Sequence, residues 1–509
     1  MLQVQHLTVT HARDLRVLFE DLSFTVSGAD RLAVIGEEGD GKSTLLQLIA
    51  RWPEHPAWCA VQGRIACPGE RIGYLPQEAD FPPDASVYDY CASHPAFAAS
   101  GWEELAAACA VTGLDPALPY LPSPAAALSG GERVKLRLTL LLLEGPSLLL
   151  LDEPTNDLDT QALEALERMM TGCGLPIVFV SHDETLLRRT ATRILHLESL
   201  RGRQTPRWTL ANIPYDAYVS ERADAFRRQE QQAQQERREK AARDERLRQI
   251  EERVAHAQES ISRRDPHGGR LLKKKMKAVK SLEHRFTRED EAMTKRPWAE
   301  RAMDASWAGG IALPEGKVVL DLNLPELTAG GRTLAHNIRL HVRGPEKVLI
   351  VGPNGSGKTT LLRRIAEELL PRGDLSAGYM PQNYLDTLPP DRTPVEALHT
   401  SGEKEQLTAI RTGLGALRFT REEMEHPIRL LSGGQKAKLF LLRMILERHN
   451  VLLLDEPSRN LSPLSAPVLR EMITGFSGCV ICVTHDRELI RAWPGRIVSL
   501  SVDGLIAFR

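Results

Sequence analysis

Residues 128–159 read LSGGERVKLRLTLLLLEGPSLLLLDEPTNDLD, and residues 431–462 repeat the pattern as LSGGQKAKLFLLRMILERHNVLLLDEPSRNLS. Each copy follows a glycine-rich loop that contains a lysine, GEEGDGKST at residues 36–44 and GPNGSGKTT at residues 352–360. The spacing repeats as well, because Asp152 precedes His182 by 30 residues and Asp455 precedes His485 by 30. This matched order of motifs predicts that one folding unit occurs twice in the chain.

The segments around these motifs predict the fold class. Short apolar runs bounded by glycine or proline, such as SLLLLDEP at residues 147–154 and PIVFVSHD at residues 176–183, are typical of buried strands in a parallel sheet. A chain of 509 residues can form about three units of roughly 150 residues each. We therefore predict an α/β fold with two P-loop domains in tandem, at residues 1–212 and 313–509, joined by a helical linker at residues 213–312.

The linker has a different composition, because residues 215–296 are rich in Gln, Glu, Arg and Lys and nearly free of glycine and proline. Two narrow apolar stripes predict two helices that pair as an antiparallel coiled coil. The turn between the two helices is expected at residues 263–269, RRDPHGG. The second helix is expected to end at Pro297. An arm of about 35–40 residues would extend roughly 55–60 Å. The stripe residues are Leu247, Ile250, Val254, Ala257 and Ile261, then Leu272, Met276, Val279, Phe286 and Met293.

Positive charge is concentrated near the predicted turn. Residues 260–285 hold nine Lys or Arg and two acids, a balance of +7 in a chain whose net charge is −2. A solvated helix would mix the two signs, as residues 236–253 do, and that ordinary alternative stays open. The concentration favours a polyanion partner, RNA phosphate in particular. The expected RNA-contacting residues are Arg263, Arg264, His267, Arg270, Lys273, Lys274, Lys275, Lys277 and Lys280.

The glycine-rich loops predict phosphate binding. Glycines let backbone N–H groups turn toward phosphate oxygens, while Lys42 and Lys358 reach the outer phosphates and Ser43 and Thr359 offer hydroxyls to Mg²⁺. Two such loops occur, each followed by the other motifs in order. A purely structural role for the loops does not explain this repetition. The expected nucleotide-binding residues here are Gly36, Gly39, Gly41, Lys42, Ser43, Thr44, Gly352, Gly355, Gly357, Lys358, Thr359 and Thr360.

Acidic residues at the ends of apolar strands predict the metal and catalytic positions. Asp152 and Asp455 would hold Mg²⁺ directly or through water, and the glutamates that follow them would polarise the attacking water. Gln77 and Gln382, in GYLPQE and GYMPQN, fit positions that contact metal, water or nucleotide. The expected metal ligands are Ser43, Gln77, Asp152, Thr359, Gln382 and Asp455. The expected catalytic residues are Glu153, Glu456, His182 and His485, the histidines lying near the outer phosphate.

The two LSGG segments begin helices whose serine hydroxyl, amides and N-terminus can bind phosphate. Here the chain resembles the ATP-binding cassette superfamily, in which each ATP lies between the glycine loop of one cassette and the LSGG motif of the other. The resemblance implies that site one joins Lys42, Asp152 and Glu153 to Ser432 and Gly434. Site two would join Lys358, Asp455 and Glu456 to Ser129 and Gly131. The motif residues are Ser129, Gly130, Gly131, Ser432, Gly433 and Gly434.

Two positions depart from the pattern of that superfamily. The first glycine loop has Glu38 where the superfamily usually has Asn, and the second copy has Ser462 where the superfamily usually has the Asp found at Asp159, another expected nucleotide-binding residue. The two sites are therefore expected to turn over unequally, with neither inactive. A stacking partner for adenine is harder to find, and His11 is a weak candidate.

Fused cassettes joined by a charged helical hairpin resemble the ABC-F family. The segments NIPYDAYVSER at residues 212–222 and KKKMKAVKSLEHRF at residues 273–286 carry part of this resemblance. It implies a factor that binds the tRNA exit site of the 70S ribosome, with the linker reaching 23S rRNA and the peptidyl-site tRNA. ATP would close the two cassettes, and hydrolysis would let them part.

The resemblance is greatest to the antibiotic-resistance (ribosomal protection) branch. Only 35 residues separate Lys42 from Gln77, too few for the extra arm of the translational-throttle branch, and no long basic tail follows Arg509. The expected drugs are lincosamides, pleuromutilins and streptogramins A, displaced indirectly through tRNA and rRNA by a tip at residues 266–272. Three alternatives stay open: rescue of stalled ribosomes without a dedicated drug role, the ATPase subunit of a transporter, and a structural ATPase that bridges DNA through its coiled coil.

The remaining features predict a cytoplasmic monomer. A membrane span needs about 18 consecutive apolar residues, and the sequence contains no run of that length. The seven cysteines are scattered rather than paired, which favours a reducing compartment. The two cassettes are expected to pair within one chain.

Overall fold

The computed structural model describes most of the 509 residues. Outside the described residues lie 13–14, 78–80, 83–84, 156–157, 159, 201–204, 261–273, 275–276, 278, 282–284, 287–289, 291–312, 385–386, 400–403, 418, 460 and 508–509. The chain divides into two compact units, one formed by residues 1–216 with 300–509 and the other by residues 217–299. The first unit contains both motif repeats, which we call the first lobe (residues 1–212) and the second lobe (residues 313–509).

Each lobe is built on a six-stranded, mostly parallel sheet, which confirms the predicted α/β fold. All five residues of β6 (Leu148–Asp152) and of β14 (Val451–Asp455) are buried, as central strands covered on both faces must be. The first sheet has the order β5-β6-β7-β3-β8-β9 and the second β13-β14-β15-β12-β16-β17. The final strand of each sheet pairs antiparallel to its neighbour. The other strands are β3 (Arg31–Ile35), β5 (Ile72–Leu75), β7 (Ile177–Val180), β8 (Arg193–Leu200), β9 (Thr205–Ala211), β12 (Lys347–Val351), β13 (Ala377–Met380), β15 (Cys479–Val483), β16 (Arg496–Ser501) and β17 (Gly504–Ala507).

An antiparallel sheet accompanies each parallel one. In the first lobe it has the order β2-β1-β4, and in the second it is the hairpin β10-β11. Apolar residues alternate along these strands, so that one face joins the hydrophobic core beneath the glycine loop. The strands are β1 (Leu2–His11), β2 (Val17–Val26), β4 (Cys59–Ala66), β10 (Val318–Ala329) and β11 (Arg332–Arg343).

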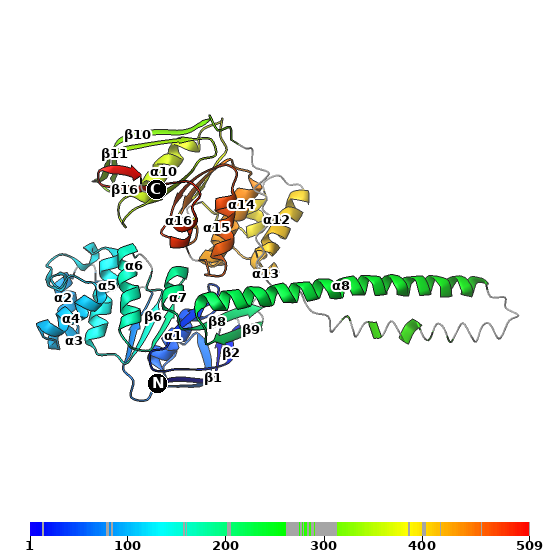
Figure 1. Ribbon diagram of the computed structural model, residues 1–509, viewed down its shortest axis with the longest axis horizontal. Coiled ribbons are helices and arrows are strands. Elements are labelled where there is room, and N and C mark those ends of the chain that lie inside the picture. Colours follow the sequence, from blue (N-terminus) through cyan, green and yellow to red (C-terminus); the bar gives the residue numbers. More distant parts are fainter. Residues whose placement is uncertain are drawn as a thin grey trace. The chain divides into compact units, whose positions relative to one another are not determined.

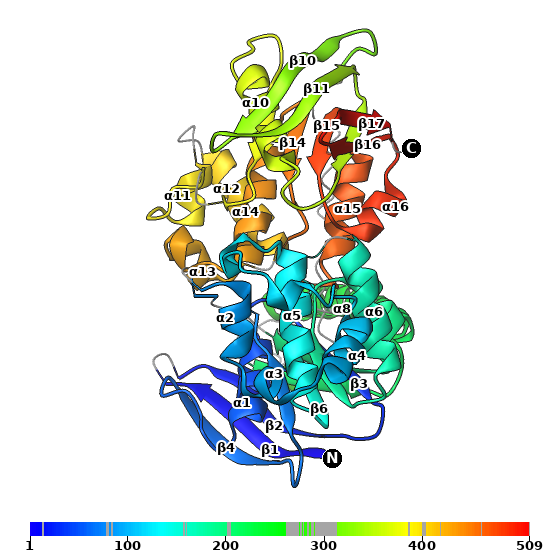
Figure 2. The same cartoon turned by 90° about the vertical axis from the view of Figure 1, so that its left-hand side faces the viewer.

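Helices cover the parallel sheets and position the motifs (Figure 2). Both glycine loops run directly into a helix, and both LSGG segments do the same. The helices of the first lobe are α1 (Lys42–Arg51), α2 (Val87–Ala92), α3 (Pro95–Ala99), α4 (Trp102–Thr112), α5 (Gly130–Leu143), α6 (Thr160–Gly172) and α7 (Glu184–Thr190). Those of the second lobe are α10 (Lys358–Leu369), α11 (Pro394–Leu398), α12 (Lys404–Ala416), α13 (Arg421–Glu425), α14 (Gly433–Leu446), α15 (Ala466–Gly475) and α16 (Arg487–Ala492).

The linker begins with α8 (Tyr215–Ser260), a continuous helix of 46 residues (Figure 1). At 1.5 Å per residue this is about 69 Å, longer than the predicted 55–60 Å, because α8 begins at Tyr215 and has 46 residues. Asp290 accepts a hydrogen bond from Lys240 at 2.6 Å and pairs with Arg243, whose guanidinium also lies over the Phe286 ring. The chain therefore reverses direction between positions 243 and 286, as an antiparallel hairpin requires.

The described part of the linker departs from the predicted stripe in one respect. Ile250 is 40% exposed, so it does not lie on a continuous buried seam. The expected turn at residues 263–269 and most of the second stripe lie outside the described residues. Of the expected RNA contacts, Lys274, Lys277 and Lys280 are described and exposed, whereas Arg263, Arg264, His267, Arg270, Lys273 and Lys275 are not described. In the part of the chain that the structure describes, none of the helices combines the length and apolar character that a membrane crossing requires.

Candidate functional site

Each glycine loop closes around its own lysine. Lys42 Nζ donates to the carbonyl oxygens of Gly36 and Glu37 at 3.0 and 2.9 Å. Lys358 makes the equivalent pair of bonds at 3.0 and 2.8 Å, and both lysines are buried. Gly41, the residue before α1, has φ +89°, and a side chain there would also meet the core at 3.2 Å. The loop is therefore held in a curved shape, in which the amides of Glu37 and Asp40 are bonded within the loop and the other amides can face an anion.

The expected metal ligands meet in pairs at the end of the sheet. Ser43 Oγ donates to Asp152 Oδ1 at 3.0 Å, and Thr359 Oγ1 donates to Asp455 Oδ1 at 3.2 Å. The other oxygen of Asp455, Oδ2, is buried without a hydrogen-bond partner in the described structure. A hydroxyl beside a buried carboxylate with an unused oxygen is a donor set that fits Mg²⁺, a cation with a preference for oxygen ligands.

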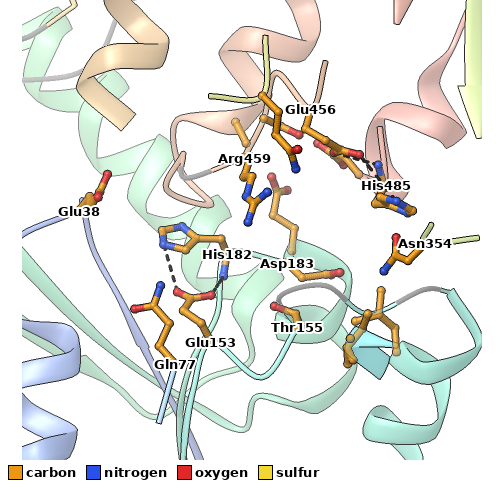
Figure 3. A pocket seen from close by; sticks show the side chains of 18 of the residues that line it. Glu38, Gln77, Glu153, Thr155, His182, Asp183, Asn354, Glu456, Arg459 and His485 are labelled. Carbon is orange, nitrogen blue, oxygen red and sulfur yellow. Dashed lines mark hydrogen bonds and ion pairs between the residues drawn. The ribbon is translucent and has the colours of Figure 1, made fainter. Parts of the chain in front are cut away.

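Each expected catalytic glutamate directly follows a strand-ending aspartate and lies near a histidine (Figure 3). Glu153 Oε1 lies 3.1 Å from His182 Nε2, and its Oε2 accepts from the backbone N–H of His182 at 3.2 Å. Glu456 accepts from the backbone N–H of His485 at 3.2 Å, but its other oxygen is 3.8 Å from the imidazole. Both glutamates have positive φ, 49° and 50°, directly after the strand. This turn aims both carboxylates at the end of the sheet where the glycine loop lies.

Burial sets the protonation behaviour of these groups. Desolvation raises the pKa of Glu153 and of Glu456 to about 7, and that of Asp152 to about 6. Desolvation, assisted by the nearby Lys42 charge, lowers the pKa of His182 to about 4. His182 is therefore neutral at pH 7, and its proton lies on Nδ1, which donates to the carbonyl oxygen of Leu461. Its Nε2 has no proton to donate, so among the described residues Glu153 is held by the His182 backbone N–H while its Oε1 has no hydrogen-bond partner. A glutamate with a pKa near 7 is suited to accept a proton from water.

The two LSGG serines have different surroundings. Ser129 is exposed and caps α5 by accepting from the Glu132 amide at 3.3 Å. Ser432 is half-buried, and the amide of Gly434 in the same motif donates to Glu38 Oε2 at 2.7 Å. Glu38 belongs to the first glycine loop, so the structure brings together the loop and the LSGG motif that were expected to share site one.

Further contacts join the lobes beside site one. His182 Nδ1 lies 2.7 Å from the carbonyl oxygen of Leu461. Ser462, where the superfamily usually has Asp, donates to Glu37 Oε1 at 2.7 Å, and Ser465 donates to the same oxygen at 2.8 Å. An aspartate at position 462 would place a second negative charge beside Glu37. The unusual Ser462 and the acidic first loop are therefore structurally matched.

A cavity of about 1240 Å³ contains residues of both expected sites. It brings together Lys42 and Lys358 with their neighbouring hydroxyl residues, both catalytic glutamates and both histidines. Gln77 and Gln382 line it as well, as does Gly130 of the first LSGG motif. Figure 3 shows Glu153 with His182 and Glu456 with His485 around this space. Asp159 lies outside the described residues.

Some lining residues were not anticipated from the sequence. The Trp58 ring lies 5.4 Å from the His11 ring, and both line the cavity, so an aromatic pair stands where only His11 was expected. Arg133 and Arg459 also line the cavity. Arg133 follows the LSGG motif within its helix, a position at which the sequence could have indicated an anion-binding side chain. Trp58 lies in a proline-containing loop that carries no comparable signal.

A largely buried ionic cluster joins the lobes, and its members Asp183, Glu184 and Arg487 also line the cavity. Arg487 contacts Glu167 at 2.5 Å and Asp183 at 3.0 Å, and Arg470 pairs with Glu184. From the LSGG motif onward, equivalent residues are 303 positions apart, as Ser129 and Ser432 are. By this offset Glu167 corresponds to Arg470, and Glu184 to Arg487. The two ion pairs are thus equivalent, with both acids in the first lobe and both arginines in the second.

Comparisons with known proteins agree with this geometry. A family model described as ABC transporter matches residues 19–156 and 335–459. The tylosin resistance ATP-binding protein TlrC of Streptomyces fradiae is 32% identical over 97% of this chain and 96% of its own length. The ribosome protection protein VmlR of Bacillus subtilis is 30% identical over 96% of this chain and 85% of its own. The solved structure of RNase-L Inhibitor has the same fold, with a TM-score of 0.56 at 18% identity over 99% of this chain and 90% of its own.

Proposed function

Because this chain belongs to the ABC-F family of the ATP-binding cassette superfamily, we propose that it is a ribosome-protection ATPase that dislodges antibiotics from the large ribosomal subunit. Its enzymatic activity is ATP hydrolysis, with ATP and Mg²⁺ as cofactors. The observation that carries the proposal is the similarity over nearly the whole chain, linker included, to a tylosin resistance protein and a ribosome protection protein. The similarity also extends over most of the length of both relatives.

The residues of each site divide the work of hydrolysis. Bound Mg²⁺ neutralises the charge that develops on the phosphates. In site one, Ser43 and Asp152 would hold the ion, and Lys42 would leave its loop carbonyls to bind the outer phosphates. Glu153 would accept hydrogen bonds from the attacking water, and the backbone N–H of His182 would keep its carboxylate in place. Site two would use Thr359, Asp455, Lys358, Glu456 and His485 in the same way.

The linker would carry the effect of closure to the ribosome. The protein would bind at the tRNA exit site of the 70S ribosome, in the cytoplasm, where the linker can reach 23S rRNA and the peptidyl-site tRNA. The exposed Lys274, Lys277 and Lys280 supply positive charge for phosphate contacts, and the rest of the cationic segment at residues 263–275 would add to it. Displacement of the tRNA would alter the drug pocket indirectly and free the drug. We expect activity against lincosamides, pleuromutilins and streptogramins A, with macrolides included in the test because of TlrC.

Ribosome binding is tested by sedimentation. The Glu153→Gln/Glu456→Gln variant should bind ATP, close and remain closed, so it should pellet with ribosomes in ATP far more than the parent protein does. The matched control is Lys42→Ala/Lys358→Ala, which should bind little nucleotide and stay in the supernatant. If the double glutamine variant pellets no more than the parent, the ribosome proposal fails, and a transporter subunit becomes the better hypothesis.

The drug role is tested separately by deleting residues 266–269 from the expected tip. The deletion should abolish resistance in cells while ATP hydrolysis by the purified protein remains. Minimal inhibitory concentrations of a lincosamide, a pleuromutilin, a streptogramin A and tylosin measure this. Resistance that survives the deletion would exclude the tip as the effector. Ribosome binding by the intact protein without resistance to any of these drugs would favour the rescue of stalled ribosomes.

A further inference from the structure

The first glycine loop contains two carboxylates that reach across to the second lobe. Glu38 Oε2 accepts a hydrogen bond of 2.7 Å from the backbone N–H of Gly434. This amide is in the first turn of α14, where unpaired N–H groups and the helix dipole attract an anion. The Glu38 carboxylate therefore occupies a donor that, in a closed composite site, would bind the outer phosphate of ATP.

Glu37 strengthens the same connection. It accepts from the hydroxyls of Ser462 and Ser465 at 2.7 and 2.8 Å and lies 3.5 Å from the ammonium group of Lys438. Lys438 and both serines are buried, so these bonds form away from bulk water and are stronger than surface contacts of the same kind. Two neighbouring carboxylates of one loop thus engage four donors of the other lobe.

The second glycine loop cannot make an equivalent connection through its own carboxylates. It has Pro353 and Asn354 at the positions of Glu37 and Glu38. The motif expected to face it is also more open, since Ser129 is exposed whereas the equivalent Ser432 is half-buried. Gly130 of that motif lines the cavity together with Lys358, which leaves space for a nucleotide between them.

We propose that Glu38 is an internal substitute for the outer phosphate of ATP at site one, and that it makes site one the weaker of the two ATP sites. The Gly434 amide has one hydrogen to donate, so the triphosphate must displace the carboxylate before site one can close on nucleotide. The displaced Glu38, with Glu37 beside it, then adds negative charge next to the phosphates and opposes binding. Site two has no such competitor in its loop, so ATP there would control closure. This inference depends on ATP binding alone and not on the ribosome.

Isothermal titration calorimetry with ATP and Mg²⁺ tests the proposal on the full chain without ribosomes. The Glu153→Gln/Glu456→Gln variant serves as the parent because it binds ATP without consuming it. This parent should show two classes of site. Adding Glu38→Asn, which restores the residue of the second loop, should tighten the weaker class about tenfold, the change that corresponds to about 1.4 kcal/mol. The stronger class should be unchanged.

Two further variants keep the test decisive. Asn354→Glu in the same parent transfers the acid to the second loop and should weaken the stronger class. Glu38→Gln keeps the length of the side chain but removes its charge, so it should tighten the weaker class by a smaller factor than Glu38→Asn. Thermal melting identifies any variant that is misfolded. Equal affinities at the two sites of the parent, or unchanged affinities in Glu38→Asn, would overturn the proposal while leaving the ribosome proposal intact.

Discussion

The two lobes carry the same catalytic residues at the same spacing, yet their glycine loops differ in charge. The first loop has Glu37, Glu38 and Asp40 where the second has Pro353, Asn354 and Ser356. Each lysine bonds its loop carbonyls in the same way in both lobes, so these substitutions leave the local fold of the loop unchanged. Glu37 and Glu38 change what the loop presents to the opposite lobe, whereas Asp40 accepts a hydrogen bond from the Glu37 N–H within the loop at 2.9 Å. Two sites with the same catalytic residues can therefore differ in how readily they close on nucleotide.

The buried ionic cluster shows the same division of charge. The first lobe supplies Glu167 and Glu184, and the second lobe supplies Arg487 and Arg470 at equivalent positions. Two first lobes facing each other in this arrangement would bring acids together, and two second lobes would bring arginines together. The pairing of unlike lobes is therefore favoured electrostatically. One contact, between Arg188 and Glu488 at 2.8 Å, has the opposite polarity and lies nearer the surface.

The largest effect is expected from reversing one charge of this cluster. Arg470→Glu would leave Glu184 facing another carboxylate in a buried position, and breaking such a pair costs about 3–5 kcal/mol. We expect the free energy of unfolding to fall by this amount, measured by urea denaturation, together with loss of ATPase activity.

The double variant Glu184→Arg/Arg470→Glu is the control for that reversal. It should recover part of the stability, because the ion pair is restored with opposite polarity. Recovery should be incomplete, since Asp486 lies 3.7 Å from Arg470 and Arg188 lies 3.6 Å from Glu184. If the single reversal is as stable as the parent, the division of charge between the lobes has no energetic role.

A second prediction concerns the catalytic glutamate that each lobe contains. Burial raises the pKa of Glu153 and of Glu456 from an unfolded value near 4.5 to about 7. A raised carboxyl pKa destabilises the folded state above pH 7, and the penalty disappears as the pH falls through about 4.5, where both states are protonated. One pKa unit corresponds to about 1.4 kcal/mol, so each penalty is about 3 kcal/mol at most.

Replacing either glutamate by Gln removes its penalty. Nucleotide-free Glu153→Gln and Glu456→Gln should therefore be more stable than the parent at pH 8 and equal to it near pH 4.5, as measured by urea denaturation at both pH values. The two variants should gain similar amounts because the pKa of each carboxyl group is raised to about the same value, about 7. Stabilisation of one variant alone would show that the lobes differ at their catalytic residues and not only in their loops.

The third prediction separates the sites by activity. Loss of a general base lowers turnover by about 10²–10⁴-fold. If site two controls the cycle, Glu456→Gln should lower kcat for ATP about 100-fold, whereas Glu153→Gln should lower it by about twofold. Steady-state phosphate release measures both, and the parent and the double variant set the limits. Equal losses in the two single variants would contradict the inequality of the sites.

The sequence predicted the parts of the site that depend on local pattern. Strand-ending Asp152 and Asp455, the glycine loops and the LSGG helices follow from short motifs whose geometry is set by neighbouring residues. The contacts of Glu37 and Glu38 depend on which surface faces the loop, and that is a property of the whole fold. The sequence did hold a partial signal, because Glu38 and Ser462 both departed from the usual pattern. The contact between Ser462 and the loop that contains Glu38 is seen only in the structure, in which the two lobes face each other.

The charged cluster was missed for a related reason. Glu167 and Glu184 look like ordinary helix-surface acids when each lobe is considered alone, since surface helices are rich in such residues. Comparison of the two repeats at the 303-residue offset would have shown acid replaced by arginine at both positions. A change of sign at equivalent positions of an internal repeat is therefore a usable sign of a surface where the repeats meet.

The smallest expected effect comes from restoring the usual residue at position 462. Ser462→Asp removes a hydroxyl that donates to Glu37 at 2.7 Å and puts a carboxylate in its place. Glu37 keeps Ser465 and Lys438 as partners, so the cost should be about 1 kcal/mol rather than that of an unpaired buried charge. The variant should unfold at slightly lower urea concentration and bind ATP at site one more tightly, because the first loop is released from the second lobe. Adding Glu37→Gln should remove the repulsion, keep the backbone N–H bond to Asp40 and restore stability. If Ser462→Asp weakens ATP binding at site one, Ser462 supports nucleotide there rather than the contact between loop and lobe.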